Sequence, residues 1–310
     1  MVRLFAALAA AAALLSQASA VERPKILGVA HFGVYVSDLM KAREFYQGLL
    51  GYEDPFTLAR ADGAMDFASV KINDTQFIEL YNRPTAGEGQ LHHVALQTDD
   101  AERMRAYLAS KGVAVPAAVA TSPAADATFT IKDPDGHDLE FIEYRPGSRT
   151  SRDREQHLPA SRIAERAMHV GILVGSLERA NAFYRDILGF TEFWRGSAAN
   201  SKTLSWVNMR VPDGSDYLEL MLYDELPPPA NRGSAHHICL VVANADEAIV
   251  KLHERPARKA YQRLLSIRTG INRKRQINLF DPDGTRVELM EAETVDGQPA
   301  PSSTLPPPRK

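Results

Sequence analysis

The sequence has little of two things that would restrict its function class. It contains a single cysteine, Cys239, so the chain has no internal disulfide. Its formal net charge is only −3, which provides no general attraction to nucleic acid or to an anionic membrane. Hydrophobic residues make up 45% and charged residues 24% of its 310 residues, a balance typical of globular proteins. This length is sufficient for two domains.

The most prominent apolar run lies at the N-terminus. Arg3 precedes the run LFAALAAAAALL, and the small residues of QASA follow, ending at Ala20. A basic start, a short apolar core and a small-x-small end are typical of an export signal peptide, and the run is too short to span a membrane. We therefore expect residues 1–20 to be removed and the mature protein, starting at Val21, to be periplasmic or secreted. An uncleaved anchor is the alternative.

Most of the remaining chain is a tandem duplication. Four segments recur in the same order with only small insertions: HFGVYVSDLMKAREFYQGLLGYE and HVGILVGSLERANAFYRDILGFTE, FIELY and YLELM, LHHVALQTDD and AHHICLVVAN, DPDGHDLEFIE and DPDGTRVELME. Such repetition identifies two modules, at 27–145 and 166–292. A polar linker, 146–165, joins them. The Pro- and Ser-rich tail, 293–310, is expected to be disordered.

Residue periodicity predicts an α+β fold in each module. Alternating apolar segments such as VAHFGVYV and MHVGILV predict strands, and amphipathic segments closed by glycine predict helices at 39–51 and 177–189. In the first module, further strands are expected near 66–72, 76–82, 92–98, 127–132 and 138–144, with a helix at about 100–111. Each module is then a pair of βαβββ units, four in all, and DPDG forms a tight turn before the last strand.

Polar residues recur at matching places on these apolar strands. Successive strand residues face opposite sides of a sheet, so His92 and His93 cannot both enter one cavity. A carboxylate among apolar strand residues is costly unless it is paired or bound to metal. Two imidazoles and two carboxylates in each module make a divalent-metal shell that leaves positions open for water or substrate. The candidate metal ligands are His31, Glu79, His93, Glu140, His169, Glu219, His237 and Glu288.

These motifs resemble the vicinal oxygen chelate superfamily, which includes glyoxalase I, bleomycin-resistance proteins and extradiol dioxygenases. The resemblance rests on H-x-G-x-x-V followed by FY and LLG or ILG, on IEL or LEL, on HHVAL or HHICL, and on DPDG-x-x-x-E. It implies paired βαβββ units that form cup-shaped mixed sheets with helices outside and a divalent ion (Zn, Ni, Mn or Fe) at the floor. It also implies that the eight residues above are ligands and that His92 and His236 face away as structural residues.

Three activities are compatible with the resemblance. A glyoxalase-like lyase or isomerase uses two His and two Glu ligands, and the glutamate after DPDG, here Glu140 or Glu288, moves a proton while the metal stabilises an enediolate. An extradiol dioxygenase uses two His and one Glu on Fe(II), with a further His and Tyr for which 127–132 and 269–280 offer no candidate. A bleomycin-resistance-like binding protein generally lacks the metal shell. The glyoxalase-like enzyme, acting on a small oxygenated substrate, is therefore preferred. Glutathione is not expected as part of that substrate, because Tyr35 and Leu173 stand where glyoxalase I carries an arginine.

Some features leave alternatives open. The cups can form within each module or across the two, and the fusion of the modules is compatible with a monomer. Cys239 shares strand parity with His237, so it either lines the cup or packs as a small apolar residue. The segment RTGINRKRQ is either a solvated basic loop or an anion-binding surface. Residues that could surround the second cup are Trp206, Tyr217, Arg268, Arg273, Lys274 and Arg275.

Overall fold

The structure is a computed structural model that describes residues 21–83, 89–233 and 235–309. The predicted signal peptide, 1–20, lies outside the described residues. Among the described helices, none is both long and apolar enough to cross a membrane.

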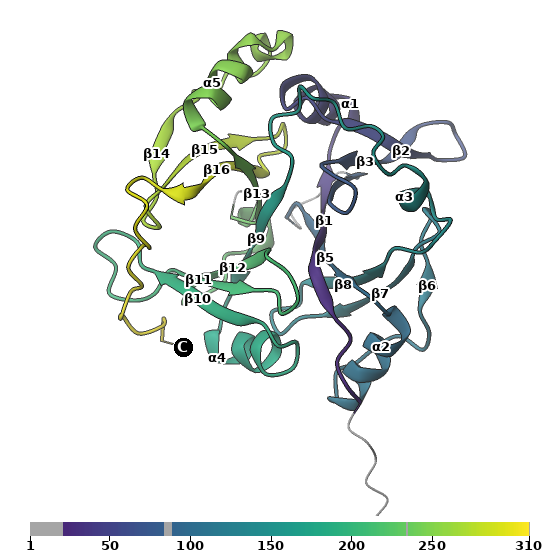
Figure 1. Cartoon of the computed structure of the whole chain (residues 1–310), viewed down its shortest axis with the longest axis vertical. Coiled ribbons are helices and arrows are strands. Elements are labelled where there is room, and N and C mark those ends of the chain that lie inside the picture. Colours follow the sequence, from purple (N-terminus) through teal and green to yellow (C-terminus); the bar gives the residue numbers. More distant parts are fainter. Residues whose placement is uncertain (1–20, 84–88, 234, 310) are drawn as a thin grey trace, which may run out of the picture.

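The first module forms one curled eight-stranded sheet with short helices outside it (Figure 1). Its strands are β1 (Ile26–Val36), β2 (Glu53–Ala59), β3 (Met65–Lys71), β4 (Phe77–Asn82), β5 (Leu91–Thr98), β6 (Ala120–Thr121), β7 (Ala127–Lys132) and β8 (Asp138–Glu143). Its helical segments are α1 (Leu39–Arg43), the π-helical η1 (Glu44–Leu49) and α2 (Ala101–Ser110), and α3 (Arg149–Arg152) lies in the linker.

The second module repeats this arrangement. Its strands are β9 (Ala167–Val174), β10 (Thr191–Gly196), β11 (Trp206–Arg210), β12 (Tyr217–Leu222), β13 (His237–Val242), β14 (Ile267–Thr269), β15 (Lys274–Phe280) and β16 (Arg286–Thr294). Its helical segments are α4 (Leu177–Ala180), the π-helical η2 (Asn181–Arg185), η3 (Pro229–Asn231), α5 (Ala245–Glu254) and η4 (Pro256–Lys259). The α+β fold and its two modules are therefore confirmed.

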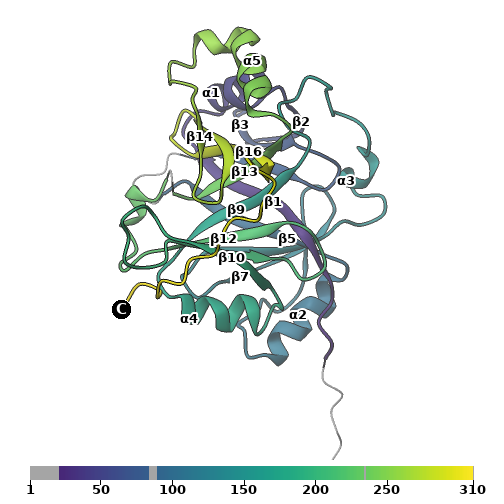
Figure 2. The same cartoon turned by 60° about the vertical axis from the view of Figure 1, so that its left-hand side comes forward.

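The strand order shows how the cups form. The first sheet runs β2-β3-β4-β1-β5-β8-β7-β6, and the second runs β10-β11-β12-β9-β13-β16-β15-β14. Each sheet is built from one module alone, so the cups form within the modules and not across them. Figures 1 and 2 show the two sheets side by side, with β1 and β9 near the middle of the molecule.

The predicted helices at 39–51 and 177–189 are each divided. Asp38 and Ser176 cap the first turns with their side chains, as residues of their type do at helix N-termini. The α-helical turn then widens into a π-helix that buries Tyr46 in the first module and Tyr184 in the second. A π-helix is not visible in residue periodicity, because one extra residue in a turn changes the spacing only locally.

The C-terminal segment differs from the expectation of disorder over its described part, 293–309. Strand β16 continues to Thr294, and the following residues run along the edge strand β10. The amide of Ser303 donates to the Arg195 carbonyl (2.9 Å), and the Trp194 indole donates to the Pro301 carbonyl (3.3 Å). The backbone groups of an edge strand lack partners within the sheet, and these contacts supply some of them.

The DPDG turns connect the modules reciprocally. Asp133, in the turn of the first module, accepts a hydrogen bond from the Tyr184 hydroxyl of the second (2.9 Å). Asp281, in the turn of the second module, is 3.3 Å from the Tyr46 hydroxyl of the first. The pKa values of the two carboxyl groups are shifted in opposite directions. Burial raises the pKa of Asp281 to about 7, whereas the same effect at Asp133 is outweighed by hydrogen bonds from His137, which hold its pKa below its usual value.

This difference predicts opposite effects of Asp→Asn variants on stability. Asp281 has its pKa raised above the ordinary 3.8, so its contribution to stability is present below pH 3.8 and is lost as the pH rises through about 7. The substitution Asp281→Asn should therefore have a more stabilising effect on the free energy of unfolding at pH 8 than at pH 4. The difference between the two pH values should be at most about 4 kcal/mol for a pKa shift of this size. Asp133→Asn should destabilise it at pH 8. Urea unfolding between pH 4 and 8 measures both, and parallel curves for wild type and both variants would contradict the assignment.

Candidate metal centres

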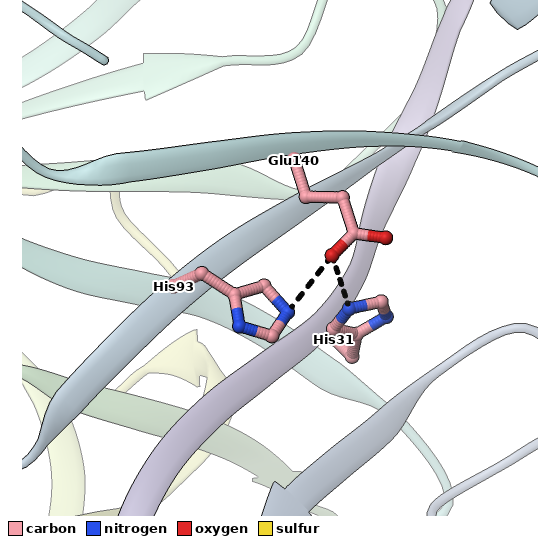
Figure 3. Close-up of side chains that lie close together, drawn as sticks. All are labelled: His31, His93 and Glu140. Atoms are coloured by element: carbon pink, nitrogen blue, oxygen red, sulfur yellow. Dashed lines mark ion pairs between the residues drawn. The ribbon is translucent and has the colours of Figure 1, made fainter. Parts of the chain in front are cut away.

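The centre of the first sheet brings four polar side chains together. His31 lies on β1, Glu79 on the parallel neighbour β4, His93 on the antiparallel neighbour β5, and Glu140 on β8, which pairs with β5. Glu79 and His93 are both register partners of Gly33, on either side of β1. The curl of the sheet brings the four side chains together, and Figure 3 shows Glu140 pointing between the two imidazoles. His31, Glu79 and Glu140 also line the cavity of the first cup.

A glycine in each module makes room for the second imidazole. A Cβ atom at Gly33 would lie 2.4 Å from the ring of His93, and one at Gly171 would lie 1.9 Å from the ring of His237. Any side chain at these positions would displace the histidine from the centre of the sheet. The glycine of the H-x-G motif is thus part of the site because it has no side chain.

Three residues of the first cluster, His31, His93 and Glu140, have ligand atoms within 4.8 Å of one another, and Glu79 lies near both histidines. The Glu140 Oε2 atom lies 3.5 Å from His31 Nε2 and 3.2 Å from His93 Nε2, and Glu79 Oε2 lies 3.6 Å from each of these nitrogens. Ligands bound at about 2.1 Å in a tetrahedron are about 3.4 Å apart. Both Nε2 atoms are buried and have no hydrogen-bond partner among the described residues. The residues therefore fit a divalent ion.

The ionisable groups of the first cluster shift one another's pKa values. Burial lowers the pKa of His31, but Glu79 and Glu140 outweigh that effect and raise it overall, while burial lowers the pKa of His93 to about 3. Burial alone would raise the pKa of Glu140, but the two histidines and Thr128 bring it to about 2. Burial raises the pKa of Glu79, whose Oε2 accepts a hydrogen bond from the Tyr81 hydroxyl (2.7 Å). Glu140 is therefore ionised and held by three groups, and Glu79 is held more loosely.

The second cluster has the same residue types but less regular spacing. His169 Nε2 and His237 Nε2 are 3.1 Å apart, and Glu288 Oε2 lies 3.6 Å from the first and 4.0 Å from the second. Glu219 Oε2 is 3.4 Å from His237 Nε2, and burial raises its pKa to about 8. Here too the predicted residues lie close together: the ligand atoms of His169, His237 and Glu288 are within 4.8 Å of one another, and Glu219 lies beside His237.

Arg286 distinguishes the second cluster, and the sequence did not single it out. Its Nη2 atom lies 2.6 Å from His237 Nδ1, which is also 3.0 Å from the Ala235 carbonyl. A guanidinium can only donate hydrogen bonds, so this contact favours the His237 tautomer that carries its proton on Nε2. A metal would need the lone pair of that same nitrogen. The Ala235 carbonyl favours the opposite tautomer. Asp138 holds the corresponding place in the first module, so the difference in charge between the clusters was present in the aligned DPDG segments.

The first cup encloses a cavity of about 370 Å³ above the cluster. Its walls combine aromatic with polar and charged residues. The linker closes one side, because Thr150 of α3 donates to Asp126 (2.7 Å) and the buried Lys71 ammonium donates to the Gln156 carbonyl (3.0 Å). Sequence patterns did not indicate this role for the linker. The aromatic residues that line the cavity are Phe56, Phe67, Phe77, Tyr81 and Tyr144.

The second cup is smaller, about 220 Å³. Trp206 lines it as expected, and Trp194, which bonds to the tail, lines it as well. Of the four basic residues considered from the sequence, Arg268 lines this cavity. The other three contact groups outside it: Arg273 pairs with Asp296, Lys274 with the Ala292 carbonyl, and Arg275 with Asp246 and Glu291.

The remaining candidates have structural positions. Cys239 is fully buried and packs with Met168, Tyr217 and Met290, which matches the apolar alternative. The Tyr217 ring stacks on His169, with ring centroids 4.6 Å apart. His92 and His236 line a separate cavity and neither cup, although the His92 ring also lies against His93 and stacks on Tyr81 of the first cup.

Solved structures with the same fold include extradiol dioxygenases. A variant of homoprotocatechuate 2,3-dioxygenase from B. fuscum is 17% identical, with a TM-score of 0.67, over 91% of this chain and 76% of that chain. The 2,3-dioxygenase LapB from Pseudomonas sp. KL28 is 17% identical, with a TM-score of 0.65, over 90% of this chain and 97% of that one. At this level of identity the similarity shows the fold alone.

Sequence relatives correspond to single modules. The uncharacterized protein YwbC of Bacillus subtilis (strain 168) is 28% identical over 125 residues, which is 36% of this chain and 94% of YwbC. The uncharacterized protein YwkD of the same strain is 30% identical over 130 residues, 40% of this chain and 94% of YwkD. The family model described as Glyoxalase/Bleomycin resistance protein/Dioxygenase superfamily matches residues 28–141 and again 166–289. The chain therefore belongs to the glyoxalase/bleomycin resistance protein/dioxygenase superfamily, with one member domain in each module.

Proposed function

We propose that the protein is a metal-dependent enzyme whose first cup performs glyoxalase-like lyase or isomerase chemistry on a small oxygenated substrate. The observation that carries this proposal is the four-membered shell of the first cup, in which the oxygens of both glutamates lie 3.2–3.6 Å from the two Nε2 atoms. Two imidazoles and two carboxylates suit Zn, Ni, Mn or Fe. The predicted signal peptide would place this activity in the periplasm or outside the cell.

A metal at this position would polarise a substrate oxygen and make a neighbouring C–H bond more acidic. The chain's own residues must then move the proton. Glu140 is fixed by both histidines and by Thr128, so it suits the role of a constant ligand. Glu79 contacts the same histidines but is otherwise held by Tyr81 alone. We assign the proton transfer to Glu79, and the assignment of this role to Glu140 from the sequence is the alternative.

Glu→Gln variants test this assignment, because Gln keeps the shape and one oxygen but removes the base. Glu79→Gln should keep its metal and lose about 10²–10⁴-fold in turnover, the usual contribution of a general base. Glu140→Gln should lose metal affinity. The measurements are metal content and kinetics on the best substrate from a screen of hydroxy- and oxo-carbonyl compounds, with Glu53→Gln on the exposed rim as the control.

Each other outcome has a definite meaning. Full turnover in Glu79→Gln, together with metal-loaded but inactive Glu140→Gln, would assign the base to Glu140. Near-normal turnover in both variants would refute the proposed mechanism.

An Fe(II) extradiol dioxygenase is the second candidate. It is favoured by one feature of the first cup: the ligand atoms of His31, His93 and Glu140 all lie within 4.8 Å of one another and form a two-His, one-carboxylate set. Similar solved structures are dioxygenases by name. Glu79 opposes this reading, because it occupies a position near both imidazoles that oxygen chemistry would require to be open.

The two candidates differ in a simple assay. With Fe(II) and oxygen, the wild-type protein should not open the ring of catechol or of homoprotocatechuate, as followed by the visible absorbance of the ring-opened product. An authentic extradiol dioxygenase in the same buffer is the positive control. Catalytic ring opening by the wild-type protein would replace the lyase proposal with the dioxygenase.

The second cup should bind a divalent ion more weakly than the first, because Arg286 adds positive charge beside His237. Arg286→Asp introduces the residue that the first module carries at this place. The loss of one positive charge and the gain of a negative one, a few ångströms from the ion, should tighten the second site by about tenfold or more. Metal titration by calorimetry measures this change, with Arg273→Asp on the outer loop as the control. Equal affinities in wild type and Arg286→Asp would show that Arg286 does not weaken the site.

A further inference from the structure

A pair of histidines lies between the modules, outside both cups. His137 follows the DPDG turn of the first module, and His236 immediately precedes β13 of the second. Their ring centroids are 5.2 Å apart, with the ring planes at 82°. His236 is 3% exposed and the His137 side chain 8% exposed, and both line a cavity of about 150 Å³.

The hydrogen bonds of His137 determine which of its nitrogens has a free lone pair. Its Nδ1 atom lies 2.9 Å from Asp133 Oδ2, which also accepts from Tyr184. An ionised carboxylate can only accept, so Nδ1 carries the proton and Nε2 carries the lone pair. This Nε2 atom is buried and has no hydrogen-bond partner among the described residues.

His236 has the opposite arrangement. Its Nδ1 atom is buried without a partner in the described part of the chain. The nearby Gly171 carbonyl favours a proton on the other ring nitrogen, Nε2, and this leaves the lone pair of the neutral ring on Nδ1. Three imidazoles line this cavity, those of His92, His137 and His236. Of these, His137 and His236 come from different modules, and each has a buried ring nitrogen with an unshared lone pair.

We infer that His137 and His236 form a further metal site, which binds a late first-row divalent ion such as Ni²⁺, Cu²⁺ or Zn²⁺ between the modules. Their ring separation of 5.2 Å matches the pairs in the cups, 4.7 Å for His31 and His93 and 5.1 Å for His169 and His237. Asp133 supports His137 as a carboxylate typically supports a metal-bound imidazole.

The other lining residues restrict the ion. Arg232 lines the cavity, and its charge opposes a weakly bound cation such as Mg²⁺, so the site requires an ion with high affinity for imidazole. Asp138 lines the cavity as well, and its carboxylate pairs with Lys132 (2.8 Å). Because each ligand belongs to a different module, the bound ion would link the modules and stabilise the folded chain.

The second module has no equivalent of this histidine pair. Thr285 holds the place of His137 in the second DPDG turn, and its buried hydroxyl has no partner among the described residues. The symmetry-related pair would be Thr285 and His92, which offers one imidazole instead of two. The proposed site therefore cannot be a property of the repeated module and arises only where the first turn meets the second module.

Two substitutions remove one lone pair each and keep the other hydrogen bond. In His137→Asn, the amide nitrogen replaces Nδ1 and still donates to Asp133. In His236→Gln, the amide nitrogen replaces Nε2 and still donates toward Gly171. His157→Asn, on the exposed linker, is the matched control for the loss of a histidine.

The test is equilibrium dialysis of the metal-free mature protein against Ni²⁺, followed by elemental analysis. Wild type and His157→Asn should each bind one equivalent more than His137→Asn and His236→Gln, or bind it at least about tenfold more tightly. Ni²⁺ should also raise the unfolding temperature of wild type more than that of either variant, because the ion binds only the folded interface.

The comparison decides the proposal in either direction. Equal Ni²⁺ binding and equal stabilisation in all four proteins would overturn it. A loss in His236→Gln alone would also overturn it, since that result would indicate disturbance of the neighbouring His237 in the second cup. His137→Asn touches neither cup, so its binding is the decisive measurement, and its unfolding temperature without metal verifies that it is folded.

Discussion

The structure depends on two buried imidazoles and two largely covered carboxylates at the centre of each sheet. Charges withdrawn from water are stable only when they are paired or bind a metal, so the surrounding strands must hold the four groups at close distances. Gly33 and Gly171 permit this, because no side chain occupies the space that the second imidazole of each module needs. Three further features shield the polar clusters and leave a cavity above them. These are the curl of the sheet, the linker over the first cup and the tail beside the second.

The two modules share this arrangement and differ in charge. Arg286 contacts His237 in the second module, whereas Asp138, at the matching place in the first, pairs with Lys132. A guanidinium beside the cluster opposes a cation and constrains the imidazole tautomer. The duplicated scaffold therefore supports two centres of unequal affinity for metal. A second difference, His137 in place of Thr285, affects the interface between the modules instead of the cups.

The interface itself is built from the same DPDG turns that precede the last strand of each cup. Asp133 and Asp281 each bind a tyrosine from a π-helix of the other module. The turns thus connect the glutamate-bearing strands β8 and β16 to the opposite module. Because His137 contacts Asp133 and leads into the strand that carries Glu140, a metal held by His137 would act on the same segment as the first cup.

Much of the fold and the eight cluster residues could be predicted from the sequence. The duplication preserves the order of motifs, the two-residue period of a strand separates the two histidines of each HH pair, and the family resemblance selects His93 and His237 from them. These are local patterns, and local patterns are visible in a sequence. The pairing of strands within a module, the contact of Arg286 with His237, the bonding of the tail to β10 and the approach of His137 to His236 join residues that are far apart in the chain. Only the tertiary structure decides them, because strand alternation and helix periodicity contain no information on which distant backbone and side-chain groups become neighbours when the sheets curl.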